Sequence, residues 1–336
     1  MHGGDIYNNS VDIDFSVNLN PYADSRDEDR AYPDIEQTRL RKALSEFEGV
    51  GYENVFAGCG ASQLLMAVAL AVRPKTALLI EPCFSGYAHV LAACPGCSVR
   101  RVFLKEEGSF ALTGDILDSL TDDVDLLFLA DPGNPTGRNI APDLLIRILD
   151  RAKDHGISVV LDDSFYTLSE WYVQDGRAGL VERYPGLYII RSFTKSFALP
   201  GIRMGYVMSS AENIKRIRMY LPEWNLPALS EESMLSCIAG SKDGHFYEDS
   251  VRMIRKERQF LAEKLSELGF TVFDSDTVFL LIKGREGIYE ELLKDGILIR
   301  KCDDFGGLDG RFYRIAVRER EDNVRLIDAL KKTVRS

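Results

Sequence analysis

The chain has 336 residues, of which 45% are hydrophobic and 28% charged, and its formal net charge is −11 at pH 7. This composition is typical of a globular protein long enough to form two domains. The acidic balance argues against a nucleic-acid-binding protein, because a phosphate backbone requires clustered cations. No apolar run approaches the roughly 20 residues that span a bilayer, and the first residues lack an apolar signal core. We therefore expect a cytoplasmic protein with neither nucleic acid nor membrane as a partner.

The cysteines do not predict a metal site. Six are scattered through the sequence, and Cys94 and Cys97 have the spacing of a metal or redox motif. No second pair completes a zinc site. We expect buried thiols rather than disulfides, and no bound metal.

Short apolar runs alternate with amphipathic segments from residue 54 onward. Strands are expected at 55–57, 76–80, 99–103, 126–130, 158–161, 188–191 and 204–208, and helices at 35–47, 62–72, 84–94, 113–120 and 141–155. Continuously apolar strands between helices predict an α/β fold with a mostly parallel sheet that is covered on both faces.

The pattern changes after residue 210. Helical stretches at 211–220 and 228–268 precede strands at 278–282, 297–300 and 313–317 and a helix at 322–334. This order predicts a smaller α+β domain. We expect a large domain of residues 35–210 and a small domain of residues 211–336 joined by residues 1–34 as an N-terminal arm.

Lys195 is the residue that most restricts which function this chain can have. It follows the apolar run 187–190, and Ser192, Thr194 and Arg203 lie close to it in the sequence. A buried lysine is costly unless it is paired or chemically used, and a neutral amine can form a Schiff base with an aldehyde. The hydroxyls and the guanidinium suit a phosphate. An amine beside a phosphate site suggests pyridoxal 5'-phosphate (PLP), although the segment alone also fits a surface loop.

Other candidate residues follow expected strands, where ligands bind in open parallel sheets. The turn 58–62 precedes a helix, so its amides can hold a phosphate, although an ordinary glycine turn reads the same. Asn134, in Asp-Pro-Gly-Asn-Pro-Thr-Gly, can meet a ligand hydroxyl. Asp162 can hold a pyridine nitrogen or cap a helix. Tyr87 can stack on a ring, although helical aromatics usually lie in the core.

The order of these motifs is more specific than any one of them. The Gly-rich turn, Asn-Pro-Thr-Gly, strand-Asp, Ser-x-x-Lys and Arg resemble the fold-type I PLP enzymes of the class I/II aminotransferase superfamily, over essentially the whole chain. Two branches are similar: histidinol-phosphate aminotransferase and the threonine-phosphate decarboxylase of cobalamin biosynthesis. His-Gly-Gly-Asp at 2–5, Asp-Phe-Ser-Val-Asn-Leu-Asn-Pro at 14–21 and the run 297–318 resemble the decarboxylase.

The segment after the 158–161 strand separates the two branches further. The aminotransferases usually carry Asp-Glu-Ala-Tyr, whereas this chain has Asp-Asp-Ser-Phe at 162–165. Phe165 matches the decarboxylase pattern and removes a hydroxyl that would bond the phenolic oxygen of PLP. Asp163 and Ser164 depart from both patterns.

The resemblance implies a role for each cofactor-binding residue. Lys195 is the Schiff-base lysine, Asp162 is the partner of the pyridine nitrogen, and Asn134 is the partner of the phenolic oxygen. Tyr87 stacks on the ring, and Phe84 is the alternative for this role. The cofactor phosphate is held by Gly60, Ala61, Ser62, Ser192 and Arg203.

The resemblance also implies a substrate site and a partner. Arg300 and Arg314 match the pair that grips the substrate carboxylate, and His2 and Asn18 match residues that approach the substrate phosphate. Tyr32 resembles a tyrosine that reaches the cofactor phosphate of the neighbouring subunit, which implies a homodimer with shared active sites.

The implied activity is that of a PLP-dependent enzyme acting on a small phosphorylated amino acid. Decarboxylation of O-phospho-L-threonine to (R)-1-amino-2-propanol phosphate is the first expectation. Transamination, for example of histidinol phosphate, is the alternative, and a PLP-binding protein without turnover is a third. The branch depends on which substrate bond stands perpendicular to the ring.

Overall fold

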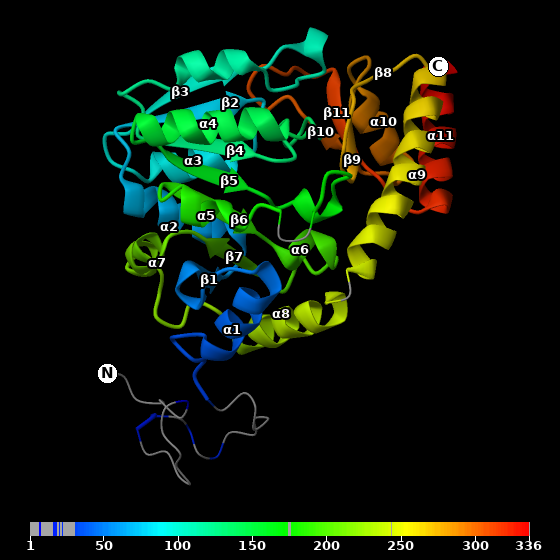
Figure 1. The fold of residues 1–336 in the computed structure, drawn as a ribbon. Helices are drawn as coiled ribbons and strands as arrows, with labels where there is room; N and C mark the ends of the chain where they lie inside the picture. Colours follow the sequence, from blue (N-terminus) through cyan, green and yellow to red (C-terminus); the bar gives the residue numbers. More distant parts are fainter. Residues whose placement is uncertain are drawn as a thin grey trace.

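The computed structural model describes residues 7, 16–18, 20, 22, 31–173, 176–242 and 244–335. Its larger sheet has seven strands in the order β1-β7-β6-β5-β4-β2-β3 (Figure 1). The strands are β1 (Val55–Gly58), β2 (Thr76–Glu81), β3 (Ser98–Phe103), β4 (Leu126–Ala130), β5 (Ser158–Asp162), β6 (Leu187–Arg191) and β7 (Gly205–Met208). β7 runs antiparallel to both β1 and β6, and the remaining neighbours in the sheet pair in parallel. The expected α/β fold with a mostly parallel sheet is confirmed, and every strand expected in this sheet is present.

Helices cover both faces of this sheet because alternate strand residues point to opposite sides. Val160 packs into a layer with α2 (Ala61–Val72), α3 (Gly86–Ala92) and α7 (Ala211–Arg218). Its neighbours Val159 and Leu161 pack into the opposite layer. That layer contains α1 (Thr38–Glu48), α4 (Pro142–Asp154), α5 (Leu180–Arg183) and α8 (Ala228–Ser241). Both faces of the strands are therefore buried, which explains their continuously apolar sequences.

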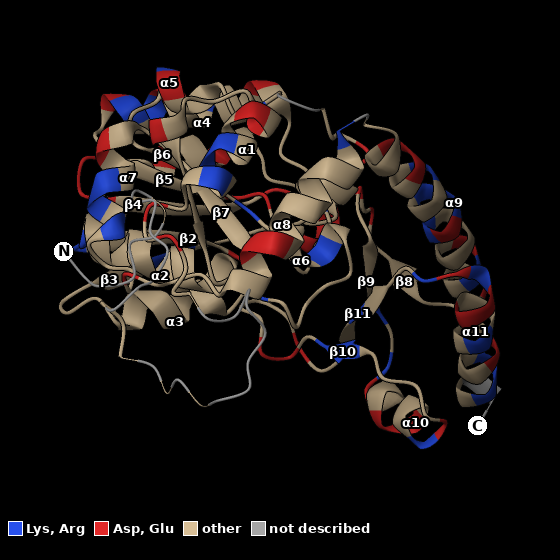
Figure 2. Cartoon of the chain, turned by 90° about the horizontal axis from the view of Figure 1, so that it is seen from below, with Lys and Arg blue, Asp and Glu red and all other residues tan. Residues whose placement is uncertain are grey.

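A smaller antiparallel sheet stands beside the large one, in the order β10-β11-β9-β8. Its strands are β8 (Thr271–Val272), β9 (Phe279–Lys283), β10 (Arg300–Lys301) and β11 (Phe312–Ala316). It packs with α9 (His245–Glu267), α10 (Ile288–Lys294) and α11 (Arg320–Arg335). Figure 2 shows acidic and basic residues interspersed along α9 and α11, as expected of solvent-facing helices.

Several elements differ from the sequence prediction. The stretch 228–268 is two helices, α8 and α9, and Gly244 precedes α9 in the left-handed region at φ 75°. The helix expected at 113–120 is a 3₁₀ helix, η4 (Gly114–Ser119), and the other 3₁₀ helices are η2 (Tyr52–Asn54), η3 (Glu106–Gly108) and η5 (Tyr166–Leu168). The strand expected at 297–300 is shortened to β10 at Arg300–Lys301, and β8 was not predicted.

The position of α8 bears on the expected domain boundary at residue 210. Met234 and Ile238 of α8 lie in the same core cluster as Leu40 and Leu44 of α1. The division into domains stays a prediction, and this packing favours a boundary between α8 and α9. Among the described residues, no helix is both long enough and apolar enough to cross a membrane.

Candidate active site

One edge of the large sheet gathers the candidate residues. The strands β1, β4, β5 and β6 are parallel and end at the same edge. The turn 58–62 lies at the end of β1, Asn134 after β4, Asp162 at the last position of β5 and Lys195 after β6. Arg203 instead precedes β7. Because β7 is antiparallel to β1 and β6, its first residues lie at that edge too.

A cavity of about 270 Å³ opens at this edge, between the two sheets. This volume is on the scale of a small-ligand site. The large sheet and its loops contribute Ala61, Ser62, Tyr87, Asn134, Asp162, Ser192, Lys195 and Arg203, and the small sheet contributes Arg300 and Arg314. The structure therefore brings most of the predicted site residues together, although they come from distant parts of the sequence.

Positive charge dominates the cavity lining. Lys195, Arg203, Arg300 and Arg314 face a single carboxylate, that of Asp162. Among the described residues, Nζ of Lys195 has no hydrogen bond or ion pair, and it lies 5.8 Å from the centre of the Phe165 ring. Burial lowers the pKa of Lys195, and the charges of Arg314 and Arg203 lower it further. The cavity therefore suits an anionic ligand and a lysine that reacts as a neutral amine.

Asp162 is held from two sides. Its Oδ1 accepts hydrogen bonds from the backbone N–H of Ser164 at 3.0 Å and from the Ser164 hydroxyl at 2.5 Å. Its Oδ2 accepts one from the Tyr87 hydroxyl at 2.7 Å. The carboxylate thus has a fixed orientation at the end of β5.

The start of α2 forms a cradle with Arg203. Gly60 has φ 80° and ψ 165°, a region open essentially only to glycine. A methyl group on Gly60 would lie 2.5 Å from a terminal nitrogen of Arg203. Ser192 caps α6 (Phe193–Ser196): its hydroxyl donates to the carbonyl of Met204 at 2.6 Å and accepts from the Thr194 N–H at 3.1 Å. Helix N–H groups, a hydroxyl and a guanidinium in one place suit a phosphate.

The two arginines of the small sheet are held differently. They are cross-strand partners on β10 and β11. Arg314 donates to Oδ1 of Asn134 and lies over the Phe279 ring at 5.3 Å. Arg300 pairs with both carboxylate oxygens of Asp304, at 2.5 and 2.8 Å. Arg314 is thus tied to the large domain, whereas Arg300 is held by its own loop.

Not every predicted site residue lies at the cavity. Tyr32 is 43% exposed and stacks on Trp224 with ring centres 4.6 Å apart, and Asn18 is exposed; neither lines the cavity. His2 lies outside the described residues. Tyr87 lines the cavity but is only 1% exposed, and its ring stacks on Phe128 at 5.0 Å.

Some residues at the site were not predicted from the sequence. Phe305 lines the cavity in addition to Phe84 and Phe165, which had been considered. Ser164 could have been found as a hydroxyl two residues after an aspartate, a spacing typical of local side-chain hydrogen bonds. Arg177 gave no sequence signal.

Arg177 joins the two loops that carry Asn134 and Asp162. Its guanidinium lies 2.6 Å from Asp131 and 3.0 Å from Asp163. Asp131 also accepts hydrogen bonds from the Asn139 side chain and the Ile140 N–H, which closes the loop containing Asn134. Burial raises the pKa of Asp131 to about 6, and the charge of Arg177 opposes this rise.

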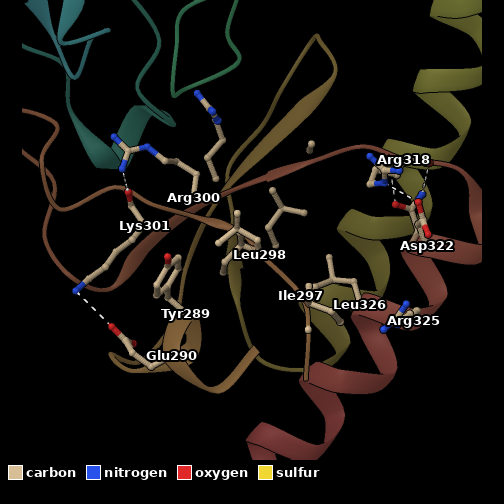
Figure 3. Close-up of a pocket in the computed structure, with 16 residues that line it drawn as sticks. Tyr289, Glu290, Ile297, Leu298, Arg300, Lys301, Arg318, Asp322, Arg325 and Leu326 are labelled. Carbon is tan, nitrogen blue, oxygen red and sulfur yellow. Dashed lines mark hydrogen bonds and ion pairs between the residues drawn. The ribbon is translucent and has the colours of Figure 1, made fainter. Parts of the chain in front are cut away.

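A second cavity, of about 940 Å³, lies on the small domain (Figure 3). Arg300 and Arg314 border it as well. Other charges around it are paired with each other: Arg318 contacts Asp322 at 2.6 Å, and Lys301 lies 3.9 Å from Glu290. It lacks both Lys195 and Asp162, so the smaller cavity is the candidate active site.

The chain is similar to known proteins over almost its whole length. The family described as Aminotransferase class I and II matches residues 8–330. The chain is 33% identical to threonine-phosphate decarboxylase of Salmonella typhimurium, over 96% of this chain and 91% of that protein. It is 32% identical to histidinol-phosphate aminotransferase 2 of Archaeoglobus fulgidus, over 95% of this chain and 92% of that protein. The crystal structure of the histidinol-phosphate aminotransferase from Clostridium acetobutylicum matches with a TM-score of 0.83 at 29% identity, covering 92% of each chain.

The chain belongs to the class I and II aminotransferase family. This family uses PLP, so the chain is a PLP-dependent enzyme, either a decarboxylase or an aminotransferase. The expected family and the expected enzyme class are both confirmed.

Two glycine substitutions, at Gly60 and at Gly96, test whether the close contact between Gly60 and Arg203 matters for PLP binding. Gly60→Ala and Gly96→Ala both place a side chain at positive φ, but the added methyl group meets Arg203 only at Gly60 and nothing within 4 Å at Gly96. Both variants should lose stability, on the order of 1–3 kcal/mol. Only Gly60→Ala should also bind PLP at least about tenfold more weakly, because Arg203 must move (a tenfold change is about 1.4 kcal/mol). Urea unfolding and PLP titration measure the two effects, and equal PLP affinities in the two variants would contradict the cradle.

The Arg177 bridge predicts a pH-dependent loss of stability. Arg177→Met leaves Asp131 buried without its cation, whereas Asp163 keeps its contact with Arg191. The loss of the Asp131 partner should cost about 3–5 kcal/mol at pH 8. A carboxyl whose pKa is raised in the folded state binds a proton there more readily than in the unfolded state, so stability rises as the pH falls through that pKa. The loss should therefore shrink at pH 5.5.

Urea unfolding at both pH values tests this. Arg183→Met is the matched control, since Arg183 is exposed on α5 and pairs with Asp150 at 3.3 Å. It should lose less than about 1 kcal/mol at either pH. An equal loss for Arg177→Met at pH 8 and pH 5.5 would count against the bridge.

Proposed function

We propose that this protein is a PLP-dependent decarboxylase that converts O-phospho-L-threonine to (R)-1-amino-2-propanol phosphate, a reaction of cobalamin biosynthesis. The observation that carries the proposal is the excess of cations in the cavity: four positive side chains surround one carboxylate. A cofactor phosphate, a substrate carboxylate and a substrate phosphate supply the matching negative charge.

The residues present fit PLP. The N-terminus of α2 at Ala61 and Ser62, the cradle of Gly60 and Arg203, and Ser192 would hold its phosphate. Asp162 would pair with the pyridine nitrogen, and Asn134 would bond the phenolic oxygen. When bound, PLP supplies an aldehyde that links to an amine and a protonated ring that withdraws electrons from the substrate.

The residues of the chain then perform the remaining tasks. The lowered pKa of Lys195 makes its Nζ a nucleophile toward the aldehyde, and later a group that can carry a proton at the substrate Cα. Asp162, whose two carboxylate oxygens are held by Tyr87 and Ser164, would favour the protonated form of the ring nitrogen.

Recognition of the substrate falls to the small sheet. Arg314 and Arg300 would grip the substrate carboxylate and orient the molecule over the ring. Among the aromatic side chains at the cavity, the partly exposed Phe84 is better placed than the buried Tyr87 to cover the ring face.

A homodimer would complete the site. Tyr32, exposed in the single chain, would reach the cofactor phosphate of the partner subunit, and Asn18 and His2 would approach the substrate phosphate. The proposal keeps a large and a small domain, but the large domain, expected at 35–210, would also include α8, since α8 packs in the same core as α1. All six cysteines are free thiols, which supports a location in the cytoplasm.

Phe165 favours decarboxylation over transamination. It lines the cavity beside Lys195 and offers no hydroxyl, where the aminotransferases usually carry a tyrosine. Transamination of histidinol phosphate is the second candidate, because a histidinol-phosphate aminotransferase is 32% identical over a similar length. A PLP-binding protein without turnover is the third.

The reaction branch is tested with PLP-loaded protein and O-phospho-L-threonine in the absence of any keto acid. Decarboxylation predicts release of many equivalents of CO₂ per active site. Conversion of the cofactor to its amine form without CO₂, reversed by 2-oxoglutarate, would establish the aminotransferase. Absence of both reactions, with histidinol phosphate also inert, would favour the binding protein.

The covalent role of Lys195 is tested by Lys195→Ala. Turnover should fall by at least about 10³-fold, since the nucleophile and the proton carrier are lost together. Borohydride should fix PLP to the wild-type protein at Lys195 and should leave the variant unlabelled. Lys294→Ala, an exposed lysine on α10, is the control for activity and labelling. Full activity in Lys195→Ala with an unchanged melting temperature would refute the role.

A further inference from the structure

The buried position of the Tyr87 ring does not favour the stacking role expected from the sequence. The side chain is 1% exposed, its ring stacks on Phe128 with centres 5.0 Å apart, and Phe84 meets it edge-on at 5.7 Å. The ring of Tyr87 is thus buried against these two aromatic neighbours. What Tyr87 offers to the cavity is its hydroxyl group.

That hydroxyl lies 2.7 Å from Oδ2 of Asp162. Burial, together with the charge of Asp162, raises the pKa of Tyr87 well above its usual value. The phenol therefore stays protonated and donates the hydrogen bond. With Ser164 on Oδ1, each oxygen of Asp162 has a donor, and the carboxylate cannot rotate without breaking a hydrogen bond.

We propose that Tyr87 is a positioning residue for Asp162, and that its hydroxyl, rather than its ring, serves the cofactor. This rests on the proposed binding of PLP with Asp162 at the pyridine nitrogen. A carboxylate that is fixed in advance loses less conformational freedom when the ring arrives, so binding is tighter. Its hydrogen bond is also directional, so it sets the angle at which the ring lies in the cavity.

Phe84 would take the stacking role instead. Phe84 lines the cavity and is only partly buried. It lies so close to Gly86 that a methyl group there would be 2.2 Å from its ring. The absence of a side chain at Gly86 is thus what allows Phe84 to adopt this position. Tyr87 and Phe84 then act on different parts of the ligand, one through Asp162 and one through the ring face.

The two roles are separated by their dependence on Asp162. Tyr87→Phe removes only the hydroxyl and should weaken PLP binding about tenfold, which corresponds to about 1.4 kcal/mol. In an Asp162→Ala background the same substitution should change the affinity less than about twofold, because its acceptor is gone. Phe84→Leu should weaken binding by the same factor in both backgrounds.

The measurements are the PLP dissociation constant, the visible circular dichroism of bound PLP and the melting temperature of the PLP-free protein. Tyr188→Phe is the matched control, since Tyr188 is also 1% exposed and lies in the same core layer. It should leave affinity and dichroism unchanged. Tyr87→Phe should alter both the affinity and the dichroism, with a melting temperature like that of the control.

Three results would overturn the inference. One is wild-type affinity in Tyr87→Phe. Another is an equal loss with and without Asp162, which would mean that the hydroxyl acts through general packing. A third is a wild-type protein that does not bind PLP, which would remove the proposed function as well. The first two leave PLP binding by the wild-type protein intact, so they refute the role of Tyr87 alone.

Discussion

The crowding of positive charge around Lys195 is the constraint that the rest of the site serves. Arg203 and Arg314 both act on its amine, and no carboxylate is paired with it among the described residues. Like charges held together are unfavourable until an anion arrives, so the fold has to hold these groups in place by other means. It does so with hydrogen bonds that do not neutralise the site: Arg203 donates to the carbonyl of Pro200 and Arg314 to the neutral side chain of Asn134. An overall acidic chain thus presents a locally cationic cavity.

The direction of β7 explains how one sheet edge can gather all these groups. Parallel strands bring their carboxyl ends to one edge, where Asn134, Asp162 and Lys195 follow. Arg203 precedes the next strand, and a residue that precedes a parallel strand would lie at the opposite edge of the sheet. Because β7 is antiparallel, Arg203 at its beginning joins the same cavity. Gly205 then passes so close to α2 that a methyl group there would lie 2.8 Å from the Ala61 N–H, so strand and helix meet where the phosphate is expected. The small sheet adds Arg300 and Arg314 to the lining of the cavity, which the edge of the large sheet alone could not supply.

Residue type and order predicted the sheet and most of the cavity, because each motif follows an apolar strand of clear length. The seven strands of the large sheet depend on local sequence, and so does the glycine turn before α2. Features that depend on side-chain direction were not accessible in the same way. Tyr87 was expected to stack because it is aromatic, yet its hydroxyl is the group that points at the site. Arg177 lies 46 residues after Asp131 and 14 after Asp163 in the sequence, and only the tertiary packing brings it between them. The helix α8 carries no sequence mark that assigns it to the large sheet, since its partner α1 lies far away in the chain.

The unequal support of the two small-sheet arginines bears on how one site can belong to a family with two reaction types. Arg314 is fixed by Asn134 and the Phe279 ring, so its guanidinium is already in place for an anion. Arg300 is bound by Asp304, and both partners are roughly half exposed, so this ion pair is weak and exchangeable. In the proposed function, a substrate anion would replace Asp304, and the angle of Arg300 would follow the substrate. Arg314 would supply the fixed part of recognition, whereas Arg300 and the space beside Phe165 would orient the bonds at Cα and so favour loss of CO₂ or loss of a proton. A small number of residues at one end of the cavity would then change the reaction while Lys195, Asp162 and Arg203 stay in place.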